Sequence, residues 1–275
     1  MAKVDILNYI SDSNILRSTY DTDTNELDIT DVPQNLNSVI TLGQGGGGTS
    51  YTGTDIATHN FVGDIQIDGT TIIDNTFAYS HITSVYAPDF VGGQVMASGF
   101  RGCAELVSAD FPLCYRLQDN TFRDCTSLKT INFPSLKYIS MSSVFSGCIS
   151  LEMACFPVGG NSADYIETGL GNNFFEGCTS LKSVDVAMCK SIGSNCFKNC
   201  TSLETVVLRR SSMASLGNVN AFEGVGRAVD IYVPSALISS YENGTNWVDV
   251  TGATLTFKAI EGSYYETHHI DGTTV

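Results

Sequence analysis

The stretch "TFRDCTSLKTINFP", residues 121–134, recurs downstream as "FFEGCTSLKSVDV" at 174–186 and as "CFKNCTSLETVVL" at 196–208. Each copy places a Phe first, a Cys three residues later and a Leu three residues after the Cys. A motif that one chain repeats several times predicts a recurring structural unit and not a single active site. The repeated residues are therefore expected to build a scaffold.

Phenylalanine marks seven such units, with intervals of 23, 22, 23, 30, 22 and 25 residues. The seven anchors are Phe77, Phe100, Phe122, Phe145, Phe175, Phe197 and Phe222. From each Leu-type position, apolar residues recur at +3 and +5, which predicts a short strand. Proline follows directly in five copies and should end that strand. A period of about 20–29 residues with this core indicates a leucine-rich-repeat solenoid.

Stacked units would share one continuous core, in which the same positions of successive repeats lie above each other. The predicted core ladder consists of Phe100, Cys103, Leu106, Phe122, Cys125, Leu128, Phe145, Cys148, Leu151, Phe175, Cys178, Leu181, Phe197, Cys200 and Leu203. Val225 takes the Cys position in the last copy. An apolar replacement favours packing over chemistry as the role of the cysteines, because a free Cys packs as a small hydrophobe.

Strand residues that alternate with the core ones should point outward on the concave face. By the +3, +5 register, these candidate binding residues are Ser84, Tyr86, Ser108, Asp110, Thr130, Asn132, Met153, Ser183, Asp185, Thr205, Asp230 and Tyr232. Small polar, acidic and aromatic side chains of this kind could hydrogen-bond a glycan or a protein, with Tyr86 and Tyr232 as anchors. An ordinary solvated sheet face is the alternative.

Composition excludes several classes of partner. The formal net charge is −15 and the pI is about 4.4, whereas nucleic-acid binding needs clustered Lys and Arg. An acidic chain is equally unsuited to an anionic membrane surface. No stretch approaches the roughly 18 apolar residues of a membrane-spanning helix, so no membrane insertion is expected. Asp5, Asn8 and Asp12 interrupt the apolar core that a secretory signal would need.

The chain offers no constellation typical of catalysis or of metal binding. Nine cysteines follow the repeat period and read as buried thiols, and only Cys196 and Cys200 have the spacing of a zinc knuckle. The acidic stretch at 21–32 lacks the Gly and Glu of a calcium loop, and a hairpin turn is favoured there. "GQGGGG" lacks the Lys of a phosphate loop. We expect no enzyme activity, no cofactor and no metal site.

Four segments are expected along the chain. Residues 1–42 read as a small β-rich module, because "RSTYDTDTNELDITDV" has the pattern of a β-hairpin. Residues 43–60 read as a Gly-rich linker. The solenoid is expected at 61–235, with "FVGDIQIDGTTI" (61–72) as the strand that begins it. Residues 236–275 are expected to form a C-terminal cap and tail.

The repeated pattern F-x-[GDN]-C-[TI]-S-L, followed by an apolar strand and Pro, resembles the BspA-like (Treponema-type) leucine-rich repeats over about 75–235. The 30-residue interval departs from that pattern. "IYVPSALISSYENGTNWVDV" (231–250) resembles the segment that closes such arrays. The resemblance implies a β-rich solenoid of short parallel strands with an irregular convex side. A short helix around 235–242 and Trp247 would cover the end of the core.

Proteins of this family are often bacterial surface proteins that mediate adhesion. The N-terminal region resembles bacteriophage virion and tail proteins in style, since a β module and a Gly-rich segment precede a recognition scaffold. The first hypothesis is therefore a virion structural or host-recognition protein that docks other virion proteins through residues 1–60. Two alternatives are a bacterial cell-surface or secreted adhesin and an intracellular interaction module. A host-cell surface glycan or protein and a homo-oligomer are the other expected partners.

Overall fold

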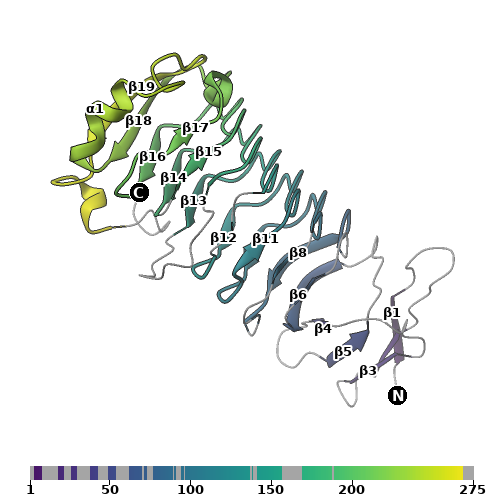
Figure 1. Cartoon of the computed structure of the whole chain (residues 1–275). Helices are drawn as coiled ribbons and strands as arrows, with labels where there is room; N and C mark the ends of the chain where they lie inside the picture. Colours follow the sequence, from purple (N-terminus) through teal and green to yellow (C-terminus); the bar gives the residue numbers. More distant parts are fainter. Residues whose placement is uncertain are drawn as a thin grey trace.

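The computed structural model is an elongated stack of coils (Figure 1). It describes the backbone of the strands within 3–53, of 62–69 and of 71–72, and it describes residues 77–88, 90, 94–95, 97–136, 138, 141–156, 169–187 and 189–268. Side-chain surroundings are described from residue 63 onward. The fold is the predicted leucine-rich-repeat solenoid of short parallel strands. No described helix has the length and apolar character needed to cross a lipid bilayer.

One side of the stack is a ladder of parallel strands, one strand from each coil. The first sheet contains β6 (Val62–Gly69), β8 (His81–Tyr86), β10 (Ser108–Asp110) and β12 (Thr130–Asn132). The second contains β13 (Met153–Phe156), β14 (Ser183–Val186), β16 (Thr205–Leu208), β18 (Ala228–Val233) and β19 (Thr254–Ala259). Within each sheet, neighbours in this order are paired in parallel. We call this side the strand-lined face.

A second side carries two-residue strands. These are β7 (Thr71–Ile72), β9 (Gln94–Val95), β11 (Arg116–Leu117), β15 (Ser191–Ile192) and β17 (Ser215–Leu216). They pair in parallel from coil to coil, and isolated bridges join Arg116 to Tyr138 and Leu170 to Ile192. Neighbouring coils such as those of β8 and β10, or of β14 and β16, are therefore hydrogen-bonded on both of these sides.

The N-terminal strands differ from the predicted domain boundaries. β1 (Lys3–Leu7), β2 (Ser18–Asp21) and β3 (Glu26–Ile29) form an antiparallel sheet, in which β2 and β3 are the expected hairpin. β4 (Ser38–Leu42) and β5 (Thr49–Gly53) are paired with each other, and β4 is paired with β6. The sheet of the solenoid thus extends across the expected boundaries at 42/43 and 60/61, because the backbone of β6 is hydrogen-bonded on both sides. The remaining residues of 43–60 lie outside the described part.

The third side is a tight turn around each Phe, and its backbone explains the small polar residues of the motif. The residue two places after Phe has a positive φ in all seven turns: Tyr79, Gly102, Asp124, Gly147, Gly177, Asn199 and Gly224. Only Gly, and less readily Asn or Asp, adopts this left-handed conformation at low cost. Gly147 is also tightly stacked, since a Cβ there would lie 2.6 Å from the Asp124 carboxylate. The [GDN] position of the motif is therefore a backbone requirement.

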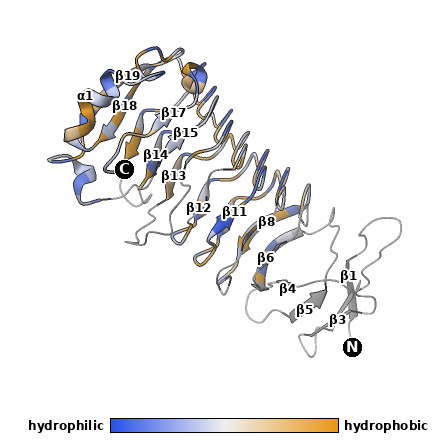
Figure 2. Ribbon diagram, in the orientation of Figure 1, coloured by the Kyte–Doolittle hydropathy of each residue, from blue (hydrophilic) through white to orange (hydrophobic). Residues whose placement is uncertain are grey.

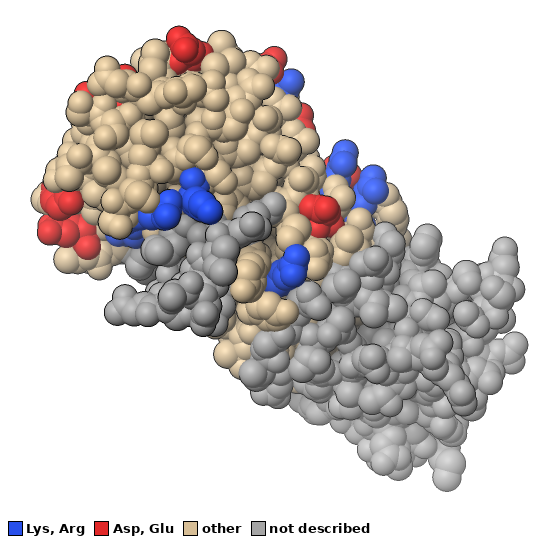
Figure 3. Space-filling view, in the orientation of Figure 1, with Lys and Arg blue, Asp and Glu red and all other residues tan. Residues whose placement is uncertain are grey.

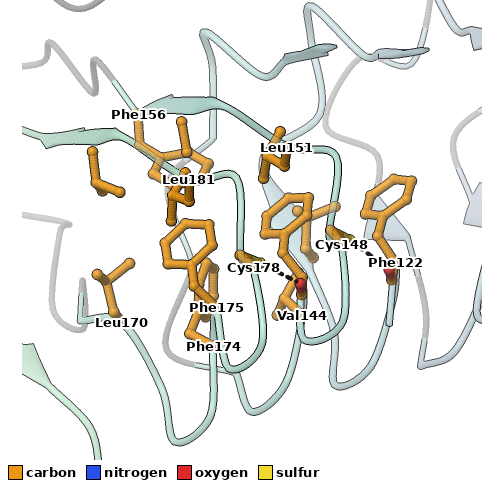
Figure 4. Close-up of a cluster of buried hydrophobic side chains, with 14 of the residues drawn as sticks. Phe122, Val144, Cys148, Leu151, Phe156, Leu170, Phe174, Phe175, Cys178 and Leu181 are labelled. Atoms are coloured by element: carbon orange, nitrogen blue, oxygen red, sulfur yellow. Dashed lines mark hydrogen bonds between the residues drawn. The ribbon is translucent and has the colours of Figure 1, made fainter. Parts of the chain in front are cut away.

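Phenylalanine rings form a continuous stack through the core. Phe100 and Phe122 lie 5.2 Å apart at an interplanar angle of 2°, and Phe122 and Phe145 lie 5.5 Å apart at 2°. All fifteen residues of the predicted core ladder are fully buried. Figure 4 shows how Phe, Leu and Cys side chains of neighbouring coils converge between the three sides, and Figure 2 shows hydrophobic and hydrophilic residues alternating along the coils. Buried apolar area of this kind is the main force that holds coils together.

The cysteines have a role beyond apolar filling. The thiol of each ladder Cys donates a hydrogen bond to the carbonyl oxygen of the Phe in the preceding coil. The Sγ–O distances are 2.9 Å for Cys103, 3.1 Å for Cys125, 3.1 Å for Cys148, 3.0 Å for Cys178 and 3.0 Å for Cys200, and two of these bonds are drawn in Figure 4. All nine cysteines are described, and none forms a disulfide.

The C-terminal end of the core is covered by the expected cap. After η1 (Val219–Phe222) and β18, the chain forms η2 (Ser235–Leu237) and the short helix α1 (Ile238–Glu242). Trp247 is buried, and its ring centre lies 6.4 Å from that of Phe222, the last ring of the stack. Its indole N–H donates to the carbonyl oxygen of Ala214 at 2.9 Å. The cap therefore buries both the apolar end and the polar backbone next to it.

Replacement of Phe122 by Ala removes a ring that lies between two parallel neighbours. We expect Phe122→Ala to lower the free energy of unfolding by about 3–5 kcal/mol, because it leaves a cavity in a closely packed core. Urea unfolding followed by circular dichroism measures this change. Leu113→Ala, at a side chain that is 38% exposed, is the matched control and should change it little. Equal effects of the two variants would contradict the proposed core.

Because the thiols are buried, we expect the folded protein to lose stability at high pH. Burial raises the pKa of Cys114, Cys189 and Cys200 to about 12, whereas a thiol in the unfolded chain has a pKa of about 8.5. At a pH between the unfolded and folded pKa values of a thiol, the unfolded chain binds fewer protons than the folded chain. The free energy of unfolding therefore falls as pH rises, by up to about 1.4 kcal/mol per pH unit for each thiol. This stabilisation is complete below about pH 8 and is lost progressively toward pH 12.

Urea unfolding at pH 8, 9 and 10 tests this pH dependence. Cys200→Val copies the residue that the last coil carries as Val225, and the variant should show a shallower decline than the unmodified chain. An unchanged slope in Cys200→Val would show that this thiol does not contribute.

Candidate binding surface

The outward residues of the first four parallel strands lie in two registered rows. Pairing places Asp64, Ser84, Ser108 and Thr130 side by side in one row, and Gln66, Tyr86, Asp110 and Asn132 side by side in the other. We call these eight residues, on β6, β8, β10 and β12, the open face. Six of them are predicted binding residues. Tyr86 is 44% exposed, so an aromatic ring stands at the surface among the polar groups.

Hydrogen bonds between coils position the polar groups of the open face. Ser84 Oγ donates to Asp64 Oδ1 at 2.6 Å, and Thr83 Oγ1 donates to the same oxygen at 2.8 Å. These two bonds hold the pKa of the Asp64 carboxyl below its ordinary value, because they favour its charged form. Asn132 Nδ2 donates to Asp110 Oδ1 at 2.8 Å. The face thus presents fixed carboxylate, amide and hydroxyl groups beside one ring.

The chemistry available to the open face is recognition through hydrogen bonds and ring contact. None of its eight residues is aliphatic, and the two carboxylates are the only charged groups among them. On the side of the molecule shown in Figure 3, charged residues form small separate groups and uncharged residues cover most of the described surface. The two carboxylates and the formal net charge of −15 make this face unsuited to an anionic ligand.

The predicted rows continue onto the second sheet, but there they are covered. Met153, Ser183, Thr205 and Asp230 share the first row, while Asp185, Val207 and Tyr232 share the second. The prediction of an exposed Asp185 is wrong: both Asp185 and Val207 are 0% exposed. Ile260, Tyr265 and Arg209 lie over them. We call Met153, Asp185, Thr205, Val207 and Tyr232 the covered face.

Asp185 is buried because Arg209, just past the end of β16, neutralises it. The guanidinium donates from Nε to Asp185 Oδ1 at 2.9 Å and from Nη2 to Oδ2 at 2.7 Å. The Arg209 side chain is 16% exposed. A forked pair of this geometry can satisfy a carboxylate that is removed from water.

The last predicted residues pair with β19. Lys258 Nζ lies 2.6 Å from Asp230 Oδ2 and 5.8 Å from the centre of the Tyr232 ring. The hydrogen bond to Asp230 raises the pKa of the Lys258 ammonium. Tyr232 is half-buried, so it does not stand free as the second anchor that the sequence suggested.

Sequence reasoning missed Asp64, Gln66, Arg209, Lys258 and Tyr265 on the strand-lined face. Asp64 and Gln66 alternate with the buried Ile65 and Ile67, so the period-2 pattern of 62–69 was the available signal. Arg209 directly follows a predicted strand. Tyr265 carries no local signal, since its position depends on how the chain folds back after β19.

Comparison with known proteins identifies the repeats. Residues 70–168 and 168–245 match the BspA type leucine rich repeat region, in six copies. The match covers more than half of the chain, and the protein therefore belongs to the BspA-type leucine-rich-repeat family. No curated protein sequence matches the chain significantly.

The chain is similar to several solved structures, of which the first supports the fold. A leucine-rich repeat protein from Bacteroides ovatus ATCC 8483 is 25% identical with a TM-score of 0.51, and the match covers 70% of this chain and 46% of that one. This chain thus spans less than half of that protein. The T. pallidum leucine rich repeat protein is 20% identical, with a TM-score of 0.45 and coverage of 58% and 81%. A leucine rich cell surface protein from Faecalibacterium prausnitzii A2-165 is 15% identical, with a TM-score of 0.41 and coverage of 92% and 73%.

The family match is to a repeat scaffold and indicates no catalytic family. It is consistent with a binding or adhesin role, and it provides no support for the expected virion role.

The buried ion pair of Asp185 and Arg209 is expected to contribute to the stability of the fold. We expect Asp185→Ala to lower the free energy of unfolding by about 3 kcal/mol, because it leaves the charge of a largely buried Arg without its partner. Chemical denaturation measures this change. Glu152→Ala is the matched control, since it breaks an ion pair with Lys182 in which both side chains are more than half exposed; such a pair contributes little. A similarly small effect for Asp185→Ala would contradict the role of the buried pair.

Proposed function

We propose that this protein is a non-enzymatic, adhesin-type binding protein of a bacterial cell surface, and that its open face binds a cell-surface glycan. The observation that carries the proposal is the pair of registered rows on β6, β8, β10 and β12, which hold hydroxyl, amide and carboxylate groups beside the exposed ring of Tyr86. Membership of the BspA-type family supports the binding role.

The composition of the open face favours a glycan over a protein as ligand. A protein–protein interface usually has an apolar core with aromatic and Met side chains, whereas the open face has one aromatic ring and no aliphatic residue. Sugar hydroxyls can exchange hydrogen bonds with carboxylates and amides, and the apolar side of a sugar ring can rest on Tyr86. Interlocked pairs such as Asn132 and Asp110 are positioned before binding, which reduces the entropy cost of ordering them.

Binding of fluorescently labelled full-length protein to a panel of intact cells tests the proposal. We expect saturable binding that periodate treatment of the cells abolishes and protease treatment does not, because periodate cleaves sugar diols. Tyr86→Ala and Asn132→Ala should each weaken binding about tenfold or more, equivalent to about 1.4 kcal/mol. Tyr79→Ala is the matched control, because Tyr79 is 52% exposed but lies in the turn and not on the open face.

Three results would contradict this proposal. Protease-sensitive, periodate-resistant binding would identify a protein ligand. Equal binding by the Tyr86→Ala and Tyr79→Ala variants would place the site elsewhere. Absence of binding, together with a defined oligomer in light scattering, would favour a structural role in an assembly such as a virion.

A further inference from the structure

The chain that follows β19 crosses the covered face as a turn and a short 3-10 helix, and most of its residues are exposed. In Figure 1 it is the yellow segment beyond α1 and β19. Gly262 adopts a positive φ of 76° at the turn, and η3 (Tyr264–Glu266) follows. We call residues 260–268 the resident segment. Its contacts with the covered face come from two of its side chains, Ile260 and Tyr265, and from two of its main-chain carbonyls.

Arg209 binds the main chain of the resident segment. While two of its nitrogens are bound to Asp185, Nη1 donates to the carbonyl oxygen of Tyr265, and Nη2 also donates to the carbonyl oxygen of His268 at 2.6 Å. The buried carboxylate of Asp185 fixes the plane of the guanidinium, so its donors are aimed before any ligand arrives. These two bonds recognise the main chain of the segment and not particular side chains.

The Tyr265 side chain occupies a seat built by three strands. Its ring centre lies 4.6 Å from that of Tyr232, in an edge-to-face arrangement at 65°. Val207 and Met153 line the same cluster, and Thr205 hydrogen-bonds the phenol. Burial raises the pKa of the Tyr265 phenol. An apolar seat that ends in a hydroxyl partner fits a tyrosine, because the ring is buried and the O–H is satisfied.

The resident segment is weakly held compared with the coils. Glu261, Gly262, Tyr264, Glu266, Thr267 and His268 are all exposed. Segments with few buried contacts open at a low free-energy cost. The covered face is therefore a preformed site with an occupant that a similar peptide can replace.

We propose that the covered face is a peptide-binding site, separate from the open face, which takes a peptide with a tyrosine side chain in a turn conformation like that of the resident segment. Tyr232, Val207, Met153 and Thr205 hold the tyrosine, and Arg209 holds the peptide carbonyls. The resident segment fills this site in the free protein and competes with an incoming peptide. The proposal does not depend on glycan binding by the open face.

Fluorescence anisotropy with a labelled peptide of residues 259–268 tests the site in the full-length chain. Tyr265→Ala empties the seat of its resident ring, and this variant should bind the peptide at least about tenfold more tightly than the unmodified chain, because competition is removed. Tyr264→Ala is the matched control: the neighbouring Tyr264 is 48% exposed and stacks on His268 within the segment. This variant should bind the peptide as weakly as the unmodified chain.

A second substitution distinguishes peptide binding at this site from nonspecific peptide binding. Arg209→Lys, added to Tyr265→Ala, keeps the charge beside Asp185 but removes the forked donors, and it should abolish the gain in peptide affinity. A peptide with Ala in place of Tyr265 should not bind. Tyr86→Ala, added to Tyr265→Ala, should leave peptide binding unchanged, which distinguishes this site from the open face.

The outcomes decide between a peptide site and a purely structural tail. A Tyr265→Ala variant with an unchanged circular dichroism spectrum that binds the peptide no better than the unmodified chain would overturn the proposal, as would equal binding after Arg209→Lys. Hydrogen exchange provides a second measurement that needs no variant. Excess peptide should accelerate exchange of the Glu266 amide, which is hydrogen-bonded within the resident segment, and unchanged exchange would also overturn the proposal.

Discussion

The stack of Phe rings, one from each coil, is the interaction on which the rest of the structure depends. Each Phe carbonyl accepts a hydrogen bond from the backbone N–H three residues later, and the ladder thiol of the next coil donates a second hydrogen bond to the same carbonyl. The turn brings the thiol to this position only because the residue before Cys has a left-handed backbone. Ring stacking and the left-handed turn recur in every coil, whereas the thiol bond is replaced by apolar packing in the last coil, which has Val225 at the Cys position.

A rigid stack gives the strand-lined face a fixed register, and the face is divided into two chemically different parts. On β6 to β12 the outward residues are polar and open, whereas on β14 to β18 they include Val207 and Tyr232 and are covered by the resident segment. Arg209 has two roles on this face, because it neutralises Asp185 and donates hydrogen bonds to two main-chain carbonyls. The same scaffold thus carries a polar surface, which we propose binds a glycan, and an aromatic surface beside Arg209, which we propose binds a peptide.

The repeat made the candidate site partly predictable. Period-2 alternation placed Ser84, Tyr86, Asp110 and Asn132 on one face, and the strand pairing has them in the expected rows. The same rule failed at Asp185, because alternation decides which side of a sheet a residue points to and not whether another segment lies over it. Covering Asp185 required Arg209 from the next coil and a loop more than fifty residues away.

The sequence by itself determined the repeating coil: the Phe, Cys and Leu core and the strand after it follow from short-range pattern, since each coil repeats one local solution. The cap at Trp247 was expected from the resemblance to a known family. Only the tertiary structure decided how the N-terminal strands and the C-terminal segment contact the sheets. The pairing of β4 with β6 and the passage of residues 260–268 over β14 to β18 are contacts made once, between segments without a repeated partner. No periodicity records such contacts, because their free energy comes from surfaces that exist only after the coils have stacked.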